Sequence, residues 1–196
     1  MAKSSKEWLR RHVSDHYVQK ARQQGYRSRA AFKLLEIDKS ESILKPGMTV
    51  LDLGAAPGGW SQVAAQKVKP RGRVSAIDLV DIAPISGVTI LKGDFRQLAI
   101  ESRVDVVLSD VAPNLSGIAN VDQARLLELA GAAVEICRKV LKPDGVFLLK
   151  AFHGEAFDDV RKRLNEVFVK VKVVKPPASR GESAETYVVA RALRPL

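Results

Sequence analysis

The sequence predicts an α/β protein in which helices cover both faces of a mostly parallel sheet. Short apolar runs that read as buried strands alternate with longer segments whose apolar residues recur at helical spacing. Such alternation is typical of strand–helix–strand units, which build parallel sheets. The connection 175–185, between the last two expected strands, is too short for a helical crossover. We therefore expect seven strands in one sheet, with one antiparallel strand near the edge.

The expected elements follow one another in a regular order. We expect helices over residues 28–41, 57–68, 122–141 and 155–168, and strands over residues 48–53, 73–78, 88–92, 104–109, 145–151, 169–174 and 186–191. Ser28 is the expected N-cap of the first helix, and Pro57 is expected in the first turn of the second. Residues 142–145 (KPDG) read as a turn before the fifth strand.

A single domain with a basic N-terminal extension accounts for the length and the charge pattern. The 196 residues suffice for one large core, and we divide them into an extension, residues 1–25, and a domain, residues 26–196. The net charge of +10 is concentrated at the ends, because residues 1–33 carry nine basic and two acidic side chains, and residues 161–196 carry nine and three. Two basic segments that clamp a polyanion fit this pattern, but so does a solubilising surface.

Cysteine content and hydropathy exclude several classes of protein. The only cysteine, Cys137, lies among apolar residues at helical spacing, so we expect a core residue and neither a nucleophile nor a metal ligand. One cysteine forms no intramolecular disulfide, and no apolar run approaches the roughly 20 residues that span a bilayer. The N-terminal residues lack the hydrophobic core of a secretory signal. We expect a cytoplasmic monomer with no metal site and no membrane partner.

A glycine-rich loop between the first strand and the next helix is the sharpest local signal. In the segment LDLGAAPGGW, residues 51–60, a strand ends at Gly54, and small residues then let a ligand approach the backbone. The segment matches neither the dinucleotide pattern G-x-G-x-x-G nor the triphosphate pattern G-x-x-x-x-G-K-[ST]. A purely structural turn is the alternative, but three glycines and a proline within six residues favour a ligand site.

Two carboxylates indicate which ligand this loop binds. Asp78 closes the second strand, where an acidic side chain can accept hydrogen bonds from ribose hydroxyls. Asp94 follows the third strand at the same sheet edge and suits an adenine amino group. Either aspartate alone could be a solvated charge at a strand end. Together with the glycine loop, and without a phosphate cradle, they favour S-adenosylmethionine over NAD.

A second group of polar residues is expected at the same edge. Asp110 follows the fourth strand, and Lys150 lies near the end of the apolar fifth strand. A buried lysine is costly unless it is paired, although a lysine at a strand end can also extend its ammonium group into solvent. Glu185 precedes the last strand, and Lys33 lies on the first expected helix.

Motifs in these segments resemble one known family. They are SRAAFKL (28–34), LDLGAAPGGWSQ (51–62), SDVAPNLSG (109–117), LLKAF (148–152) and SAETY (183–187). In this order they are similar to the motifs of the FtsJ (RrmJ-like) ribosomal RNA large-subunit 2′-O-ribose methyltransferases, over residues 26–189. The resemblance implies a single Rossmann-like class I methyltransferase domain. It further implies that S-adenosylmethionine is used to methylate a ribose 2′-hydroxyl, of a uridine, in large-subunit ribosomal RNA.

The resemblance also assigns roles to individual residues. The catalytic tetrad of the family corresponds to Lys33, Asp110, Lys150 and Glu185. Its cofactor contacts correspond to Gly58, Trp60, Asp78, Asp94 and Asp110. Lys150 is the expected centre of the site, Asp110 orients it, and Lys33 and Glu185 position the RNA. Apart from the resemblance, the position of Arg27 and Arg29 on the turn and helix leading to Lys33 makes us expect them to contact the substrate near the reacting ribose.

The chemistry is an in-line displacement, and alignment of the reacting atoms can supply roughly 7–11 kcal/mol. Neutralising a free lysine at pH 7 costs about 4.6 kcal/mol, so Lys150 could act as a base or as a stabiliser of the developing oxyanion. Two alternatives for the function stay open. One is ribose methylation of transfer RNA or of a messenger cap, and the other is a non-catalytic RNA-binding ribosome assembly factor.

Overall fold

The computed structural model describes residues 15–97, 102–113, 116–179 and 183–195 of the chain. Before the sheet lie two helices, α2 (His16–Gln23) and α3 (Ala30–Glu41). The first half of the sheet is formed by β1 (Thr49–Leu53), α4 (Gly59–Lys67), β2 (Arg73–Asp78), β3 (Val88–Lys92), a short 3-10 turn η1 (Phe95–Gln97) and β4 (Val104–Ser109). The second half comprises α5 (Ala119–Val140), β5 (Leu141–Phe152), α6 (Glu155–Val167), β6 (Phe168–Val174) and β7 (Glu185–Leu193).

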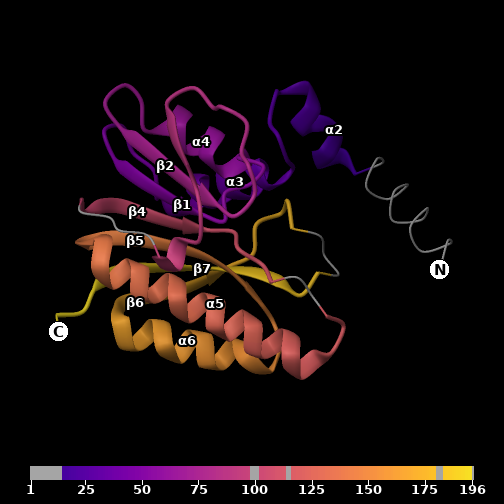
Figure 1. Cartoon of the computed structure of the whole chain (residues 1–196), viewed down its shortest axis with the longest axis vertical. Coiled ribbons are helices and arrows are strands. Elements are labelled where there is room, and N and C mark those ends of the chain that lie inside the picture. The colour runs from indigo at the N-terminus through magenta and orange to yellow at the C-terminus, as the bar shows by residue number, and fades with distance from the viewer. Residues whose placement is uncertain (1–14, 98–101, 114–115, 180–182, 196) are drawn as a thin grey trace, which may run out of the picture.

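The seven strands form one sheet in the order β3-β2-β1-β4-β5-β7-β6 (Figure 1). The strands β1 to β5 pair in parallel. Strand β7 lies between β5 and β6 and runs antiparallel to both. This confirms the predicted α/β class, with a mostly parallel seven-stranded sheet and an antiparallel strand near one edge.

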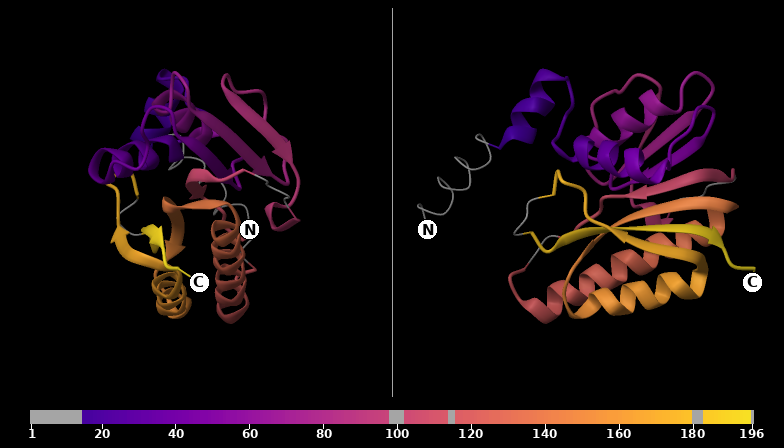
Figure 2. Two further views of the ribbon diagram at one scale, coloured as in Figure 1. Left: turned by 90° about the vertical axis from the view of Figure 1, so that its left-hand side faces the viewer. Right: turned by 180° about the vertical axis from the view of Figure 1, so that it is seen from behind.

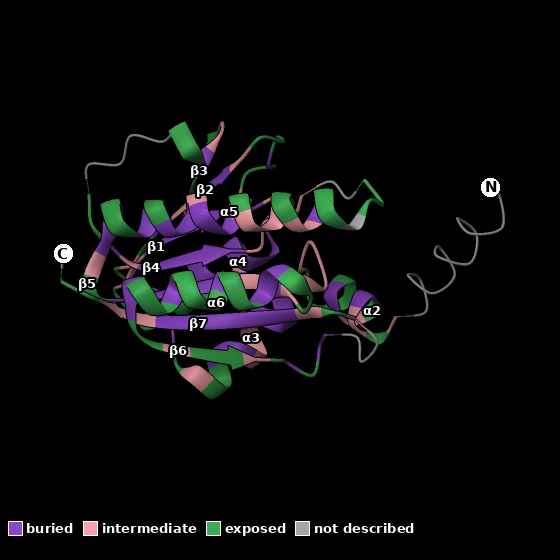
Figure 3. Ribbon diagram, turned by 90° about the horizontal axis from the view of Figure 1, so that it is seen from below, coloured by how far each residue is buried: buried purple, intermediate pink, exposed green. Residues whose placement is uncertain are grey.

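Helices cover both faces of the sheet, as predicted. Figures 1 and 2 show α3 and α4 on one face and α5 and α6 on the other. Each face buries its own apolar core, because neighbouring residues of a strand point to opposite sides. Along β7, Tyr187 and Val189 belong to the core under α3 and α4, whereas Val188 and Ala190 belong to the core under α5 and α6. Figure 3 shows β4 and β7 buried behind α5 and α6, whose outer surfaces are exposed, whereas β6 at the sheet edge is largely exposed.

The starts of three helices, α3, α4 and α5, differ from the prediction. Helix α3 begins at Ala30 with Arg29 at the N-cap, and the Ser28 hydroxyl makes no capping bond. Ser28 instead packs against the first turn of α4, where a Cβ on Gly59 would come within 2.4 Å of its Oγ. Helix α4 begins at Gly59 and not at Pro57, because Gly58 has a left-handed backbone (φ +106°) that helical residues do not adopt.

Strand β5 begins at Leu141, earlier than predicted. The predicted turn, residues 142–145, lies within this strand and interrupts its pairing with β4. Leu141 pairs with Val104, and Val146 pairs with Val106, so residues 142–145 lie opposite Asp105 alone. Lys142 closes this irregular segment, since its Nζ lies 2.6 Å from Asp105 Oδ1. Helix α5 likewise begins at Ala119, before the predicted start at residue 122.

Helix α2 falls within residues 1–25, the proposed basic extension. Its first turn is capped by Asp15, whose Oδ1 accepts from the Tyr17 amide at 3.0 Å. The helix buries Val18 and Ala21, and it lies beside α3 at one end of the molecule (Figure 1). Residues 1–14, the rest of the extension, lie outside the described residues.

Two expectations about composition can be compared with the fold. Cys137 is fully buried in the core under α5, as predicted, and burial raises the pKa of its thiol. Among the residues that the structure describes, no helix combines the length and apolar character of a membrane span.

One acidic residue is buried inside the sheet. Asp52, in the middle of β1, is fully buried between Leu51 and Leu53. Its Oδ2 accepts a 2.6 Å hydrogen bond from Ser61 of α4, and its Oδ1 has no partner among the described residues. Burial raises the pKa of Asp52 to about 7; the Ser61 hydrogen bond opposes the shift, and the charges of Asp110 and Asp78 add to it.

This buried carboxyl should make the protein less stable as the pH rises from about 4 to about 7. In that window the folded state binds a proton at Asp52 that the unfolded state, with a pKa of about 3.9, has released. Asp52→Asn should therefore flatten the decline of the unfolding free energy between pH 5 and pH 8, by about 1 kcal/mol or more. Urea denaturation at both pH values measures the difference.

Asp105→Asn is the matched control. Burial acts to raise the pKa of Asp105, but hydrogen bonds from Lys142 and the Thr49 amide lower it below the usual range. Asp105 is therefore ionised at both pH values, and its replacement should leave the slope unchanged. Equal slopes for wild type and Asp52→Asn would show that Asp52 is ionised throughout.

Candidate active site

A cavity of about 500 Å³ opens at the carboxyl ends of the parallel strands. Ligands of open α/β sheets bind at this edge, and the volume lies in the range of small-molecule sites. The segments after β1, β2, β3 and β4 supply most of the wall, including Asp78, Asp94 and Asp110. The structure thus brings together three aspartates that the sequence placed at the ends of different strands.

The glycine loop forms one side of the cavity. Gly54 has φ +67°, and a Cβ at this position would come within 2.3 Å of Val111 Cγ2. The loop is anchored to β2, because the amides of Gly54 and Ala55 both donate to the Ile77 carbonyl, at 2.9 and 3.1 Å. Only a glycine allows the end of β1 to approach the segment after β4 this closely.

Asp78 holds two sides of the cavity together. Its Oδ2 accepts from the Ala56 amide in the glycine loop, and its Oδ1 accepts from the Val80 amide after β2, each at 2.9 Å. A carboxylate has about four lone-pair sites. Asp78 can therefore accept further hydrogen bonds from a ligand without giving up those that fix the loop.

Asp94 is held by one arginine. Arg96 donates to both of its oxygens, from Nε at 2.9 Å and from Nη2 at 2.6 Å, and the Arg96 amide donates to Oδ1 at 2.9 Å. These hydrogen bonds lower the pKa of Asp94. The carboxylate is therefore a charged acceptor with a fixed orientation, and recognition of an amino group would require Arg96 to release at least one of these hydrogen bonds.

Gly58 and Trp60, the other two predicted cofactor contacts, are not among the residues that line the cavity. A Cβ on Gly58 would come within 2.5 Å of Ile85 Cδ1. The Trp60 side chain is buried in the core with its ring tilted against that of Tyr187, and its indole N–H donates to the Ala30 carbonyl at 2.8 Å. Any ligand contact from Trp60 would have to come from its backbone, in the first turn of α4.

Arg27 and Arg29, which are expected to contact the substrate, are both bound to other parts of the protein in the structure. Arg27 donates to the backbone carbonyls of Pro57, Ala83 and Pro84, at 3.1, 2.7 and 2.7 Å. It therefore braces the glycine loop against the β2–β3 connection. Arg29 donates to the Ala178 carbonyl at 2.6 Å and forms an ion pair with Asp15. Both guanidinium groups are engaged by the protein itself.

The four remaining candidates meet as two ion pairs. Lys33 Nζ donates to both carboxylate oxygens of Glu185, at 2.6 and 2.8 Å. Lys150 Nζ donates to the Asp110 carbonyl at 2.5 Å and lies 3.0 Å from Asp110 Oδ1. Both lysine side chains are only 11% exposed, so each ammonium group needs its partner.

Strand register explains why residues so distant in sequence meet. Ser109 of β4 pairs with Leu149 of β5, which places Asp110 beside Lys150. Lys150 in turn pairs with Tyr187 of β7, two residues from Glu185. Residues two apart on a strand point to the same face, so Glu185 and Tyr187 both face α3, where Lys33 lies.

Burial and the neighbouring lysine charges act in opposite directions on the pKa values of Asp110 and Glu185. Burial raises the pKa of Asp110, although the charges of Lys150 and Lys33 counteract it. For Glu185, burial also acts to raise the pKa, but hydrogen bonds from Lys33 and Tyr187 and the lysine charges outweigh it, so the pKa is lowered. Each lysine therefore acts on both carboxylates, and the four residues form one electrostatic unit.

Three further residues of this site, Tyr187, Arg96 and Asp52, were not predicted from the sequence. Tyr187 is fully buried, and its hydroxyl donates to Glu185 Oε1 at 2.9 Å. Arg96 fixes Asp94, and Asp52 lies beneath the glycine loop. The signals were an acidic residue inside an apolar strand, an arginine two residues after an aspartate, and a tyrosine on the same strand face as Glu185.

The cavity adjoins a cluster that contains the largely buried ammonium groups of Lys33 and Lys150. Asp110 belongs to both, because it lines the cavity and contacts Lys150. Ammonium groups in such surroundings stabilise negative charge that develops on an oxygen. A family model described as FtsJ-like methyltransferase matches residues 26–193. The chain belongs to this family.

Close relatives match this methyltransferase over almost its whole length. A protein of Azoarcus sp. named Ribosomal RNA large subunit methyltransferase E is 52% identical, and the alignment covers 98% of each chain. A protein of the same name from Thiobacillus denitrificans is 51% identical, over 96% of this chain and 90% of the relative.

Solved structures of similar fold include a Plasmodium falciparum protein described as a ribosomal RNA methyltransferase. It is 26% identical with a TM-score of 0.77, and covers 86% of this methyltransferase and 98% of its own chain. Fibrillarin of Aeropyrum pernix, solved with natively bound S-adenosyl-L-methionine, has a TM-score of 0.61 at 22% identity. That match covers 84% of this chain and 75% of fibrillarin, and it bears on the fold alone.

Proposed function

We propose that this methyltransferase uses S-adenosylmethionine to methylate a ribose 2′-hydroxyl in large-subunit ribosomal RNA, at a uridine. The observation that carries the proposal is the contact between Lys150 and Asp110, which joins the tetrad to the cavity. The cavity is the proposed cofactor site, and the tetrad is the proposed catalytic site. The names of the close relatives support ribosomal RNA as the substrate.

The residues present fit this cofactor. Asp78 has lone pairs left for the ribose hydroxyls, and Asp94 is a charged acceptor for the adenine amino group. Gly58 and Trp60 would contribute through the backbone at the start of α4, and Asp110 would face the reacting end. When bound, the cofactor supplies an electrophilic methyl group on a sulfonium.

The tetrad would prepare the hydroxyl for attack. Lys150 would lie against the 2′-oxygen and stabilise the negative charge that develops on it as the bond to the methyl group forms, with the hydroxyl proton passing to solvent. Asp110 orients Lys150 through both its carbonyl and its carboxylate. Lys33 and Glu185, held by Tyr187, would position the ribose so that the oxygen is in line with the methyl group, and such alignment can supply roughly 7–11 kcal/mol.

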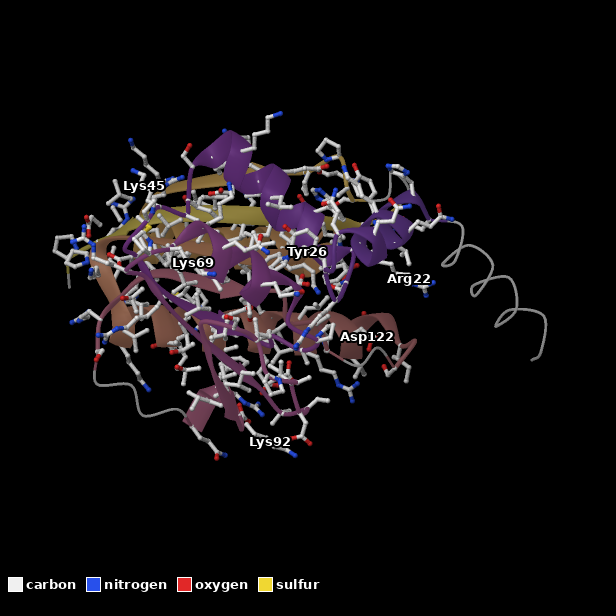
Figure 4. The ribbon with its side chains drawn as sticks, turned by 90° about the horizontal axis from the view of Figure 1, so that it is seen from above. Arg22, Tyr26, Lys45, Lys69, Lys92 and Asp122 are labelled. Atoms are coloured by element: carbon white, nitrogen blue, oxygen red, sulfur yellow. The ribbon has the colours of Figure 1, made fainter. Side chains whose placement is uncertain are left out.

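We assign the methyltransferase domain to residues 26–196 and RNA binding outside the catalytic site to the basic N-terminal segment, residues 1–25. Residues 1–14 include Lys3, Lys6, Arg10 and Arg11, and α2 adds Lys20 and Arg22. Figure 4 shows Arg22 at the same end of the molecule as Asp122 at the start of α5, and Lys45 at the opposite end. We propose that the protein is a monomer and that it acts in the cytoplasm, where the large subunit is assembled.

The deciding experiment is methyl transfer from labelled S-adenosylmethionine to three substrates in parallel. These are free ribosomal RNA, large ribosomal subunits and transfer RNA, followed by mapping of the modified nucleotide. We expect label on a ribose 2′-oxygen in large-subunit RNA. Label on transfer RNA alone would replace the substrate, and label on a base would replace the reaction.

Asp94→Ala should weaken S-adenosylmethionine binding by about tenfold or more. The variant loses a charged acceptor in the cavity wall, and hydrogen bonds to charged groups contribute about 1.5–3 kcal/mol. Calorimetry in the absence of RNA measures the affinity. Asp81→Ala is the control, because Asp81 pairs with Lys92 at 2.7 Å but is 81% exposed. Equal affinities for the two variants would remove Asp94 from the cofactor site.

Lys150→Ala should lower the single-turnover rate of methyl transfer by roughly a hundredfold or more, since it removes the donor nearest the developing charge. Cofactor affinity should stay within a few-fold of wild type. Lys142→Ala is the control, because Lys142 lies on the same strand and pairs with Asp105 at the other end. A rate near that of wild type would show that Lys150 has only a structural role.

Removal of residues 1–14 should weaken RNA binding and make it less dependent on salt. The deletion takes away four basic side chains but keeps every described contact of α2. Each lost phosphate contact reduces the slope of log affinity against log salt by about 0.7 to 0.9. Filter binding at several salt concentrations measures both effects. An unchanged slope would leave residues 161–196 as the main electrostatic contact.

A further inference from the structure

One peptide group in the connection between β6 and β7 is held from both sides. The Ala178 amide donates to Glu36 Oε2 at 2.6 Å, and the Ala178 carbonyl accepts from Arg29 Nη2 at 2.6 Å. The Ala178 methyl group is buried in a small cluster with Ala21 and Phe32. Residue 178 is therefore held in place within a connection whose described residues, 175–179 and 183–184, form no helix or strand.

The next residue, Ser179, connects the Ala178 peptide to Glu185 of the tetrad. Ser179 is buried, and its amide donates to the Pro176 carbonyl at 2.9 Å, which closes a turn. Its hydroxyl donates to Glu185 Oε1 at 3.2 Å. The same oxygen accepts from Lys33 at 2.6 Å. A shift of the Ala178 peptide would therefore move a hydrogen-bond donor of Glu185 and disturb its pairing with Lys33.

Glu36 also reaches α2 on its other side. Its Oε1 accepts from the Tyr17 hydroxyl at 3.0 Å, and burial and this hydrogen bond raise the pKa of Tyr17. Arg29 makes a parallel link through its ion pair with Asp15, the N-cap of α2. Figure 1 shows α2 and the β6–β7 connection at the same end of the molecule.

We propose that Glu36 is a positioning residue for the methyl-transfer reaction. Through the Ala178 amide and Ser179 it holds Glu185, and with it Lys33, in the geometry that places the ribose. Through Tyr17 it ties this geometry to α2, the helix next to the basic residues 1–14. The effect of Glu36 on catalysis rests on the proposed function, whereas its hydrogen bond to the loop at Ala178 does not.

Glu36→Ala, with Glu36→Gln as the conservative variant, tests this role. The alanine variant loses both hydrogen bonds, whereas glutamine can still accept from the Ala178 amide and donate to the Tyr17 oxygen. For Glu36→Ala we expect kcat to fall between about tenfold and a hundredfold. Glu36→Gln should recover most of this loss, and cofactor affinity should stay within about twofold of wild type in both.

Glu41→Ala is the matched control. Glu41 lies at the other end of α3 and pairs with Lys172 of β6 at 2.6 Å, so its removal also breaks a link between α3 and the strand pair at the edge. It should leave kcat near the wild-type value. If Glu41→Ala lowers kcat as much as Glu36→Ala, a general loss of stability explains both, and the proposal fails.

The Glu185→Gln background separates positioning from stability. If Glu36 acts through Glu185, Glu36→Ala should lower kcat much less in this background than in the wild type. Equal effects in both backgrounds would overturn the proposal, because Glu36 would then act independently of Glu185.

Amide hydrogen exchange gives a readout that needs no activity. Glu36→Ala should speed exchange over residues 176–179 and leave α4 and α6 unchanged. If wild type methylated no RNA, the proposed function would fail, and exchange would still decide whether Glu36 holds the loop. Unchanged exchange over residues 176–179 would overturn the hold itself.

Discussion

Two lysine side chains are buried at the carboxyl edge of the sheet, and the rest of the site is arranged around their need for partners. A buried ammonium group without a nearby carboxylate costs several kcal/mol. Glu185 and Asp110 meet this need for Lys33 and Lys150. Neither carboxylate could be replaced by an apolar residue without leaving a charge uncompensated. The pairs therefore constrain where α3, β4, β5 and β7 end relative to one another.

The apolar cores set these positions. Along β7, alternate residues enter the two cores, so a slip of one residue would move Tyr187 and Glu185 to the wrong face together. The hydrophobic pattern of an ordinary strand thus decides where a catalytic candidate points. Packing of Trp60 against Tyr187 on the same face fixes the start of α4 and the strand in one contact.

The features that the sequence predicted correctly depend on local pattern or on strand ends. The α/β class follows from the alternation of apolar runs, and Asp78, Asp94 and Asp110 converge because parallel strands end at one edge. The features that the sequence could not predict depend on contacts between distant residues. Ser28 does not cap α3, because it packs against Gly59, and Arg27 is engaged by Ala83 and Pro84, more than fifty positions along the chain. Helix α2 buries only Val18 and Ala21, too few for a clear periodic signal.

Asp110 is the residue through which the cavity and the tetrad influence each other. Its carboxyl faces the cavity, and its pKa is raised by burial against the opposing charges of Lys150 and Lys33. A ligand that fills the cavity excludes water, which strengthens every charge interaction that remains inside. The pairing of Asp110 with Lys150 should then tighten in the presence of the ligand. Under the proposed function, in which the cavity holds the methyl donor, its occupation and the orientation of Lys150 are coupled through Asp110, and the lysine is best held when the donor is bound.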